Sequence, residues 1–271
     1  MDGHSNDLLN VAIKAARLAG EVILANIGGL TKDDINQKKA SDFVTKVDIE
    51  SENVIIRSIR ESFPHHSILA EESSKDNKER DGFQWIIDPL DGTTNYIHGY
   101  PVFSVSIALA FKGDVIAGVI LDPLRNELFT AEKGKGAFMN NNPIRISEVG
   151  TLKDSLISTG FPFRQKDIID RYLMLFKNFF YKVSDIRRAG SAAIDLAYVA
   201  SGRCDGFFEL GLGPWDIAAG SIIIKEAGGV ITDFGGGDDF VTTGNVVTGP
   251  PALHEEMLKE VKKVFAGIID K

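Results

Sequence analysis

The sequence contains one cysteine, no long apolar run and fewer basic than acidic residues, and each shortage excludes a class of protein. Cys204 alone cannot form an intramolecular disulfide or a cysteine-rich zinc site, which is typical of a reducing compartment. No apolar segment approaches the roughly 18 residues of a membrane-spanning helix, and the acidic N-terminus lacks the basic and apolar regions of a secretory signal. We therefore expect a cytoplasmic protein that makes no use of a membrane.

The 30 basic residues are outnumbered by 38 acidic ones, which gives a formal net charge of −8. Phosphate backbones attract clustered lysine and arginine, so nucleic-acid binding is not expected. An anionic substrate would also be repelled unless cations intervene. Because bound divalent metals reverse the local charge of a carboxylate-rich site, an acidic chain remains compatible with a phosphate substrate.

Apolar spacing and turn residues predict a mixed α/β protein. Helices are expected at 8–23, 45–62, 168–180, 192–200, 217–227 and 252–266. Strands are expected at 67–70, 85–87, 155–158, 206–210 and 230–232, with an antiparallel meander over 101–145. This order predicts two α/β lobes, residues 1–150 and 151–271, that meet near residue 150.

The most informative segment is 85–95, where the apolar run Trp-Ile-Ile leads into Asp-Pro-Leu-Asp and then Gly-Thr-Thr-Asn. Asp88 and Asp91 are three residues apart around a turn stiffened by proline, so their carboxylates, with the carbonyl of Leu90, can offer hard oxygen ligands to magnesium. If a helix begins at 92–94, its free N–H groups and hydroxyls would seat a phosphate. The alternative is an ordinary Asp-Pro turn in which an acid or a hydroxyl caps a helix.

Acidic residues lie at the ends of three further predicted elements. Glu71 and Glu72 follow a buried strand, Asp216 lies at the start of an apolar helix, and Asp48 lies near the start of another. Taken one at a time, each has an ordinary structural interpretation. Glu71 and Glu72 would lie in a solvated loop, Asp216 would be an N-cap, and Asp48 would complement a helix dipole. Four acidic sites at element ends together favour one shared site.

These segments together resemble the inositol monophosphatase family, within the lithium-sensitive, magnesium-dependent phosphatases. The first family motif is similar to 85–94, the second to 214–229, and upstream elements to 42–48 and 70–73. The resemblance covers nearly the whole chain. It implies a layered α/β (α+β) sandwich of alternating helices and sheets, with the metal site between two lobes, and a homodimer.

The resemblance also implies roles for individual residues. Two or three Mg²⁺ ions would be bound by Glu71, Asp88, the Leu90 carbonyl, Asp91 and Asp216. Thr93 with Asp48, and Glu71 through a metal, would orient the attacking water. Substrate contacts would come from Asp91, Gly92, Thr93, Thr94, Gly190, Ser191, Ala192, Glu209 and Asp216. The sequence departs from the family at Ala70, where many relatives have glycine, and at the Gly-Pro-Pro turn of 249–251.

The expected reaction is hydrolysis of a sugar or polyol phosphomonoester, with inositol monophosphate as the first candidate. The same catalytic centre would also hydrolyse fructose 1,6-bisphosphate, a nucleotide 3′-phosphate, NADP or histidinol phosphate. Residues at the edge of the pocket, such as Glu209 and Arg188, would decide which of these substrates is preferred. A non-enzymatic alternative is a regulatory protein that binds RNA polymerase or antitermination factors, as some bacterial relatives do. The presence of every expected ligand argues against a decayed site.

Other conspicuous side chains are given structural interpretations. His65 and His66 lie in a predicted surface turn and are not expected to bind metal. Arg187 and Arg188 are interpreted as solvated, with a second phosphate or a subunit contact as the alternative. An aromatic stripe at helical spacing is interpreted as core or dimer interface, and it comprises Tyr172, Phe176, Phe179 and Phe180.

Overall fold

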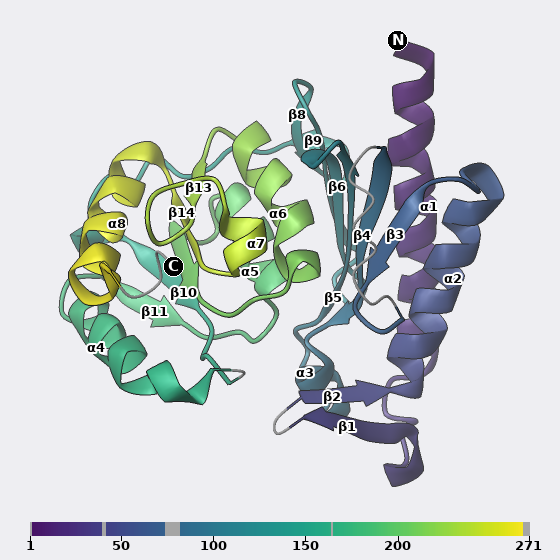
Figure 1. Ribbon diagram of the computed structural model, residues 1–271, viewed down its shortest axis with the longest axis horizontal. Coiled ribbons are helices and arrows are strands. Elements are labelled where there is room, and N and C mark those ends of the chain that lie inside the picture. Colours follow the sequence, from purple (N-terminus) through teal and green to yellow (C-terminus); the bar gives the residue numbers. More distant parts are fainter. Residues whose placement is uncertain (1, 40–41, 74–81, 164, 268–271) are drawn as a thin grey trace.

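The chain folds into alternating layers of helices and sheets, and the structure, a computed structural model, describes residues 2–39, 42–73, 82–163 and 165–267. Figure 1 shows helices on one face of a large sheet, a second pair of helices between that sheet and a smaller one, and a third pair outside the smaller sheet. In that order the helices are α1 (Asp2–Ala25) and α2 (Lys46–Ser62), α5 (Ala192–Ala200) and α6 (Pro214–Glu226), and α4 (Ile169–Phe180) and α8 (Pro251–Phe265). The predicted layered sandwich is confirmed.

The larger sheet has seven strands in the order β3-β4-β5-β6-β7-β8-β9. Strands β3 and β4 are parallel, and every later neighbour pair is antiparallel, so the predicted meander is confirmed. The strands are β3 (Ser67–Ala70), β4 (Phe83–Asp91), β5 (Ser104–Phe111), β6 (Asp114–Asp122), β7 (Glu127–Glu132), β8 (Gly136–Met139) and β9 (Asn142–Pro143).

The smaller sheet has five strands in the order β11-β10-β12-β14-β13. They are β10 (Leu156–Thr159), β11 (Asp185–Arg187), β12 (Gly206–Glu209), β13 (Val230–Thr232) and β14 (Val246–Gly249). Sequence reasoning missed β11 and β14, which are too short to show a clear alternation and are held by neighbours distant in sequence. The division into lobes 1–150 and 151–271 stays a prediction.

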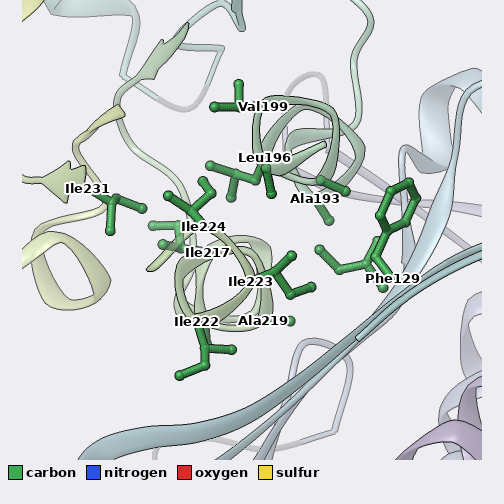
Figure 2. Packing of buried hydrophobic residues seen from close by; sticks show 14 of the residues in the cluster. Phe129, Ala193, Leu196, Val199, Ile217, Ala219, Ile222, Ile223, Ile224 and Ile231 are labelled. Atoms are coloured by element: carbon green, nitrogen blue, oxygen red, sulfur yellow. The ribbon is translucent and has the colours of Figure 1, made fainter. Parts of the chain in front are cut away.

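Helix α6 is the centre of the largest apolar core, and Figure 2 shows its side chains packing toward α5 and both sheets. It is apolar on nearly every side, as expected of a helix buried between layers. A Cβ added to Gly118 of β6 would lie 2.6 Å from Ile222, so only glycine permits this close packing of helix on sheet. The helix begins at Pro214, three residues before its predicted start, because proline fits the first turn of a helix.

The remaining elements are short. Strands β1 (Ile35–Lys39) and β2 (Asp42–Thr45) form an antiparallel pair that the polar sequence does not reveal. Helix α3 (Thr93–Ile97) begins where the sequence allowed a helix. The others are α7 (Phe240–Thr243) and the 3₁₀ turns Lys32–Asp34, Leu152–Asp154 and Lys166–Ile168. None of the described helices is long and apolar enough to span a bilayer.

Cys204 and the aromatic stripe of α4 are not part of the cavity lining described below. Cys204 is buried, and burial raises the pKa of its thiol to about 11, which agrees with a packed rather than a reactive thiol. In the aromatic stripe, Tyr172 and Phe179 are fully buried, whereas Phe180 is 63% exposed, and Met174 of the same helix is also exposed. The stripe therefore supplies core and also leaves an apolar surface on α4.

His66 lies in the turn before β3, as predicted, but its ring is partly buried there. Its ring stacks between Phe63 and Phe83, each with a centroid separation of 4.7 Å, and its Nδ1 accepts a hydrogen bond of 3.1 Å from the indole N–H of Trp85. Burial, and then the neighbouring His65, lower the pKa of His66. A proton on Nδ1 would remove the acceptor for the buried indole of Trp85.

We expect the free energy of unfolding to decline as the pH falls below about 6.5, the ordinary pKa of histidine. Because His66 has a lowered pKa in the folded state, the unfolded chain takes up its proton first, and stability is lost until the pH passes the folded-state pKa. Urea unfolding of wild type and His66→Phe between pH 7.5 and 5.5 measures this. The variant should show a smaller decline than wild type. Buried His254 also has a lowered pKa, so an equal decline in the two proteins would assign the effect to His254 and contradict the role of His66.

Candidate metal centre and catalytic pocket

A β-bulge at the end of β4 brings Asp88 and Asp91 to one side of the sheet. Asp88 pairs with Ser106 of β5 and Asp91 with Ser104, so β4 has two residues between the pairs where β5 has one. Residues three apart in a regular strand would point to opposite faces, and the extra residue restores a common face. The spacing was predicted to work through a proline-stiffened turn, but a bulge within the strand does it, with the Asp88 carboxylate also accepting the N–H of Leu90 at 3.0 Å.

Asp216 completes a cluster of three carboxylates. Ligand oxygens of Asp88, Asp91 and Asp216 all lie within 4.8 Å of one another. Asp216 comes from the first turn of α6 and accepts the N–H of Gly213 at 2.6 Å, so it caps the helix and also faces the other two acids. The interpretations of Asp216 as a cap and as a cluster member both hold, since a carboxylate has two oxygens.

The cluster suits a hard divalent cation. Asp88 is 1% exposed, and burial, followed by the charges of Glu71, Asp91 and Asp216, raises its pKa well above the ordinary value. Buried like charges are costly unless a cation compensates them. The donors are all oxygens, which is the set that Mg²⁺, Mn²⁺ or Ca²⁺ prefers.

Glu71 and Glu72 leave the end of β3 beside this cluster and meet a lysine from the β1–β2 pair. Lys38 Nζ lies 2.6 Å from Glu72 Oε1 and 3.3 Å from Glu71 Oε1. Although burial opposes its charge, the two carboxylates raise the pKa of Lys38. The buried carboxylate of Glu52 accepts the backbone N–H of Glu72 at 2.8 Å and so fixes the turn.

Asp48 and Thr93 are joined by a hydrogen bond. Thr93 Oγ1 lies 2.9 Å from Asp48 Oδ1 and 3.1 Å from the Leu90 carbonyl. The second carboxylate oxygen of Asp48 accepts the N–H and the hydroxyl of Thr45, the residue that caps α2. Burial raises the pKa of Asp48, while the bonds from Thr45 and Thr93 oppose the shift. The interpretation of Asp48 as a helix-terminus acid holds, and its other oxygen faces Thr93.

The loop before α5 holds Asp91 in place. Ser191 Oγ donates to Asp91 Oδ2 at 2.6 Å, and the N–H of Ala193 donates to the same oxygen at 2.8 Å. Ser191 is 1% exposed, so its side chain positions Asp91 and does not reach the pocket. Gly190 has φ +94°, a left-handed conformation that favours glycine, as does Gly92 at +95° before α3.

Glu209 lies at the end of β12 and faces the cluster from the smaller sheet. A Cβ added to Gly160 would lie 2.0 Å from Glu209 Oε1, so the carboxylate rests directly on that glycine. Burial, then the charges of Asp195 and Asp216, raise the pKa of Glu209 well above its ordinary value, and Arg188 opposes this shift.

These side chains surround one cavity of about 560 Å³. The residues predicted for the site that line it are Glu71, Asp88, Leu90, Asp91, Gly92, Thr93, Thr94, Gly190, Ala192, Glu209 and Asp216. Asp48 and Ser191 are not part of this lining and are hydrogen-bonded to two residues that are, Thr93 and Asp91. The structure thus gathers residues from six separate elements into one acidic pocket.

The sequence model of the inositol monophosphatase family matches residues 4–266, nearly the whole chain. The chain belongs to the inositol monophosphatase family. This membership identifies it as a phosphatase, and the motifs at 85–94 and 214–229 are the segments that form the acidic cluster.

Individual relatives are similar over almost their full length. Nus factor SuhB of Escherichia coli (strain K12) is 47% identical over 255 residues, which cover 94% of this chain and 96% of that protein. The crystal structure of extragenic suppressor protein suhB from Bartonella henselae is similar with a TM-score of 0.91 and 40% identity, covering 95% and 99% of the two chains. The structure of inositol monophosphatase from Anabaena (Nostoc) sp. PCC 7120 is similar with a TM-score of 0.86 and 39% sequence identity, and the match covers 96% of each chain.

Sequence reasoning missed three residues that support the site of this family member. Glu52 lies four residues after Asp48, a helical spacing that places both on one face and could have revealed it. Asn95 lies in the first motif, and its amide joins α3 to the loop before α5 by donating to Val102 and Ala189 carbonyls at 2.7 and 3.0 Å. Nothing local marks Lys38, because its partners are more than 30 residues away.

Proposed function

We propose that this chain is a magnesium-dependent phosphoric monoester hydrolase whose preferred substrate is inositol monophosphate. The observation that carries the proposal is the cluster of Asp88, Asp91 and Asp216 beside the hydrogen-bonded pair of Thr93 and Asp48. Two or three Mg²⁺ ions would be held by Glu71, Asp88, the Leu90 carbonyl, Asp91 and Asp216. When bound, they would neutralise phosphate charge, acidify water and stabilise the leaving alkoxide.

Thr93 would position the attacking water. Its single hydroxyl proton faces Asp48 Oδ1, so an oxygen lone pair is left to accept a hydrogen bond from water. Asp48 is buried and held at its other oxygen by Thr45, which keeps the pair in one orientation. Glu71 would assist as a metal ligand. No side chain needs to form a covalent bond with phosphate.

The substrate would be bound from two directions. The N–H groups and hydroxyls of 92–94 would receive the phosphate at the start of α3. Asp91, backed by Ser191 and Ala193, would accept a hydroxyl of the polyol, and Glu209 would accept another from the facing sheet. A polyol with hydroxyls on both sides of the phosphate ester suits this arrangement.

Phosphate release from a substrate panel tests the proposal. The panel holds inositol 1-phosphate, fructose 1,6-bisphosphate, NADP and a nucleotide 3′,5′-bisphosphate, each with Mg²⁺ and then with a chelator. We expect inositol 1-phosphate to have the highest kcat/KM and chelation to stop turnover. Comparable turnover of another substrate would remove the narrow assignment, and turnover that survives chelation would remove the metal mechanism.

The proposal includes three further properties that follow from family membership. Lithium should inhibit the enzyme, the protein should be cytoplasmic, and it should form a homodimer. The exposed apolar side chains of α4, which include Leu173, Met174 and Phe180, supply a surface for the dimer. Light scattering of wild type and Met174→Glu would test whether this surface joins two copies.

A second candidate function is regulatory binding to the transcription machinery. It is favoured by one observation, the 47% identity to a protein named Nus factor SuhB. A pull-down with purified RNA polymerase and antitermination factors should then retain the Asp91→Asn variant and lose Met174→Glu. Capture that depends on Asp91 would count against a role separate from catalysis.

A further inference from the structure

Helix α2 carries two buried carboxylates on the face that it turns to the site. Asp48 and Glu52 are 0% and 3% exposed, and a spacing of four residues places them one turn apart on the same face. Asp48 Oδ1 accepts the hydroxyl of Thr93 at 2.9 Å. Glu52 reaches another element, the turn after β3, where its Oε2 accepts the backbone N–H of Glu72 at 2.8 Å. One helix therefore contacts the metal centre at two separate points.

Glu52 is a costly acceptor for a backbone N–H. The N–H of Glu72 needs a partner, yet a neutral amide or hydroxyl oxygen would serve as well. Burial raises the pKa of Glu72, Lys38 opposes the shift, and the charges of Asp48 and Glu52 add to it. Glu52 is thus a buried acid held among other acids, and the packing of α2 alone does not call for one. What distinguishes it is its bond to the turn that carries two further acids.

The turn of Glu71 and Glu72 is held from three directions. The N–H of Glu71 donates to the Ile87 carbonyl of β4 at 3.1 Å, and the next N–H, that of Glu72, donates to Glu52 of α2. From the β1–β2 pair, Lys38 Nζ lies 2.6 Å from Glu72 Oε1. Glu71 lines the cavity, so its position there depends on β4 and, through Glu52, on α2.

We infer that Glu52 is a positioning residue for Glu71 and sets how tightly the divalent cation held by Glu71 is bound. Glu52 is not among the described residues that line the cavity, so it acts through the turn and not by contact with the ion. Because α2 also holds Asp48, the helix fixes the separation between Thr93 and Glu71. The inference rests on the proposed metal-dependent hydrolysis and adds a residue to it.

Two conservative variants separate the reach of Glu52 from its charge. Glu52→Gln keeps an oxygen at the end of a side chain of the same length, so it can still accept the N–H of Glu72. Glu52→Asp keeps the charge but is one methylene shorter and leaves that N–H without its acceptor. A positioning role therefore predicts the larger defect in Glu52→Asp, whereas a role of charge alone predicts it in Glu52→Gln.

Calorimetry with Mg²⁺ and without substrate gives the first measurement. The Kd for Mg²⁺ should rise about tenfold in Glu52→Asp and stay within about threefold of wild type in Glu52→Gln. Hydrogen exchange of the segment 67–73, followed by mass spectrometry in the absence of metal, should be faster in Glu52→Asp only.

Steady-state kinetics give the second measurement. In Glu52→Asp the Mg²⁺ concentration that gives half-maximal activity should rise about tenfold. KM for inositol 1-phosphate should stay within about twofold, because Asp91 and Glu209 are held by the loop before α5 and by β12. At saturating Mg²⁺, kcat should also stay within about twofold, since Thr93 keeps its bond to Asp48.

Glu50→Asp is the matched control, because Glu50 is an exposed acid of the same helix. It should equal wild type in every assay. An Mg²⁺ affinity in Glu52→Asp equal to that of wild type would reduce Glu52 to a structural residue and overturn the inference. A tenfold loss in Glu52→Gln would also overturn it, and this variant alone decides if Glu52→Asp does not fold.

Failure of the proposed function is separately visible. If no phosphomonoester is hydrolysed, calorimetry and hydrogen exchange still compare the two variants, and a loss of Mg²⁺ affinity confined to Glu52→Asp supports the inference. If wild type does not bind Mg²⁺, the metal centre and the role of Glu52 fall together.

Discussion

Asp91→Asn is expected to lower kcat/KM for phosphate release by about a thousandfold or more, while the protein stays folded. The substitution removes one charge from the cluster at nearly constant volume. Its oxygen still accepts the N–H of Ala193, so the loop before α5 keeps its anchor. What is lost is a charged ligand within 4.8 Å of Asp88 and Asp216.

The same substitution is expected to change thermal stability in a diagnostic way. Without metal, three clustered carboxylates repel one another, so Asp91→Asn should melt a few degrees higher than wild type. Mg²⁺ should raise the Tm of wild type, because it binds the folded state only, and should raise that of the variant far less.

Differential scanning fluorimetry across a Mg²⁺ series, together with phosphate release, measures both effects. Asp114→Asn is the control, since Asp114 is exposed on β6 and is not part of the cavity lining. It should match wild type in both assays. Retained turnover in Asp91→Asn, or an unchanged Mg²⁺ response, would contradict the metal assignment.

Thr93→Val is expected to reduce kcat by about 10²- to 10⁴-fold with little change in Mg²⁺ affinity. Valine has the shape of threonine without the hydroxyl that Asp48 orients. The metal ligands keep their positions, so the loss should appear in kcat rather than in metal binding. Stopped-flow or steady-state phosphate release over a Mg²⁺ titration separates the two.

Thr93→Ser retains the hydroxyl and should recover most of the activity. Asp48→Asn should share the defect of Thr93→Val, and the double variant should be little worse than either single one, because the two residues act as a unit. Additive losses would show that Asp48 and Thr93 act separately. A normal kcat in Thr93→Val would remove the hydroxyl from the mechanism.

Much of the site could be predicted because its motifs are local. The acids at 85–95 and the acid of Pro-Trp-Asp lie at the ends of apolar elements, and the structure places Asp88, Asp91 and Asp216 together. Helix α5 was predicted at its observed bounds, since a local apolar run marks it; the structure adds Ser191 as its N-cap. The substrate role predicted for Ser191 stays a prediction, and its hydroxyl is engaged by Asp91 in the interior.

Residues whose partners are distant in sequence escaped prediction. Lys38 is explained only by Glu71 and Glu72, and β14 only by its neighbours β12 and β13. The orientation of Asp88 and Asp91 depends on a bulge that is defined by pairing with β5. Such features depend on which strands become neighbours, and no local propensity records that.

The sequence by itself determined the layered α/β class, the family and the identity of the acids that form the centre, because periodicity, caps and motifs are properties of contiguous residues. Only the tertiary structure decided which acids share one pocket, that Asp48 and Ser191 lie behind its lining, and that Arg188 is the one basic residue among the described residues of that lining. The pocket forms only where the bulge of β4, the first turns of α3 and α6, and the end of β12 in the smaller sheet come together. Burial in that pocket, followed by the neighbouring carboxylates, then raises the pKa values of Asp88 and Glu209.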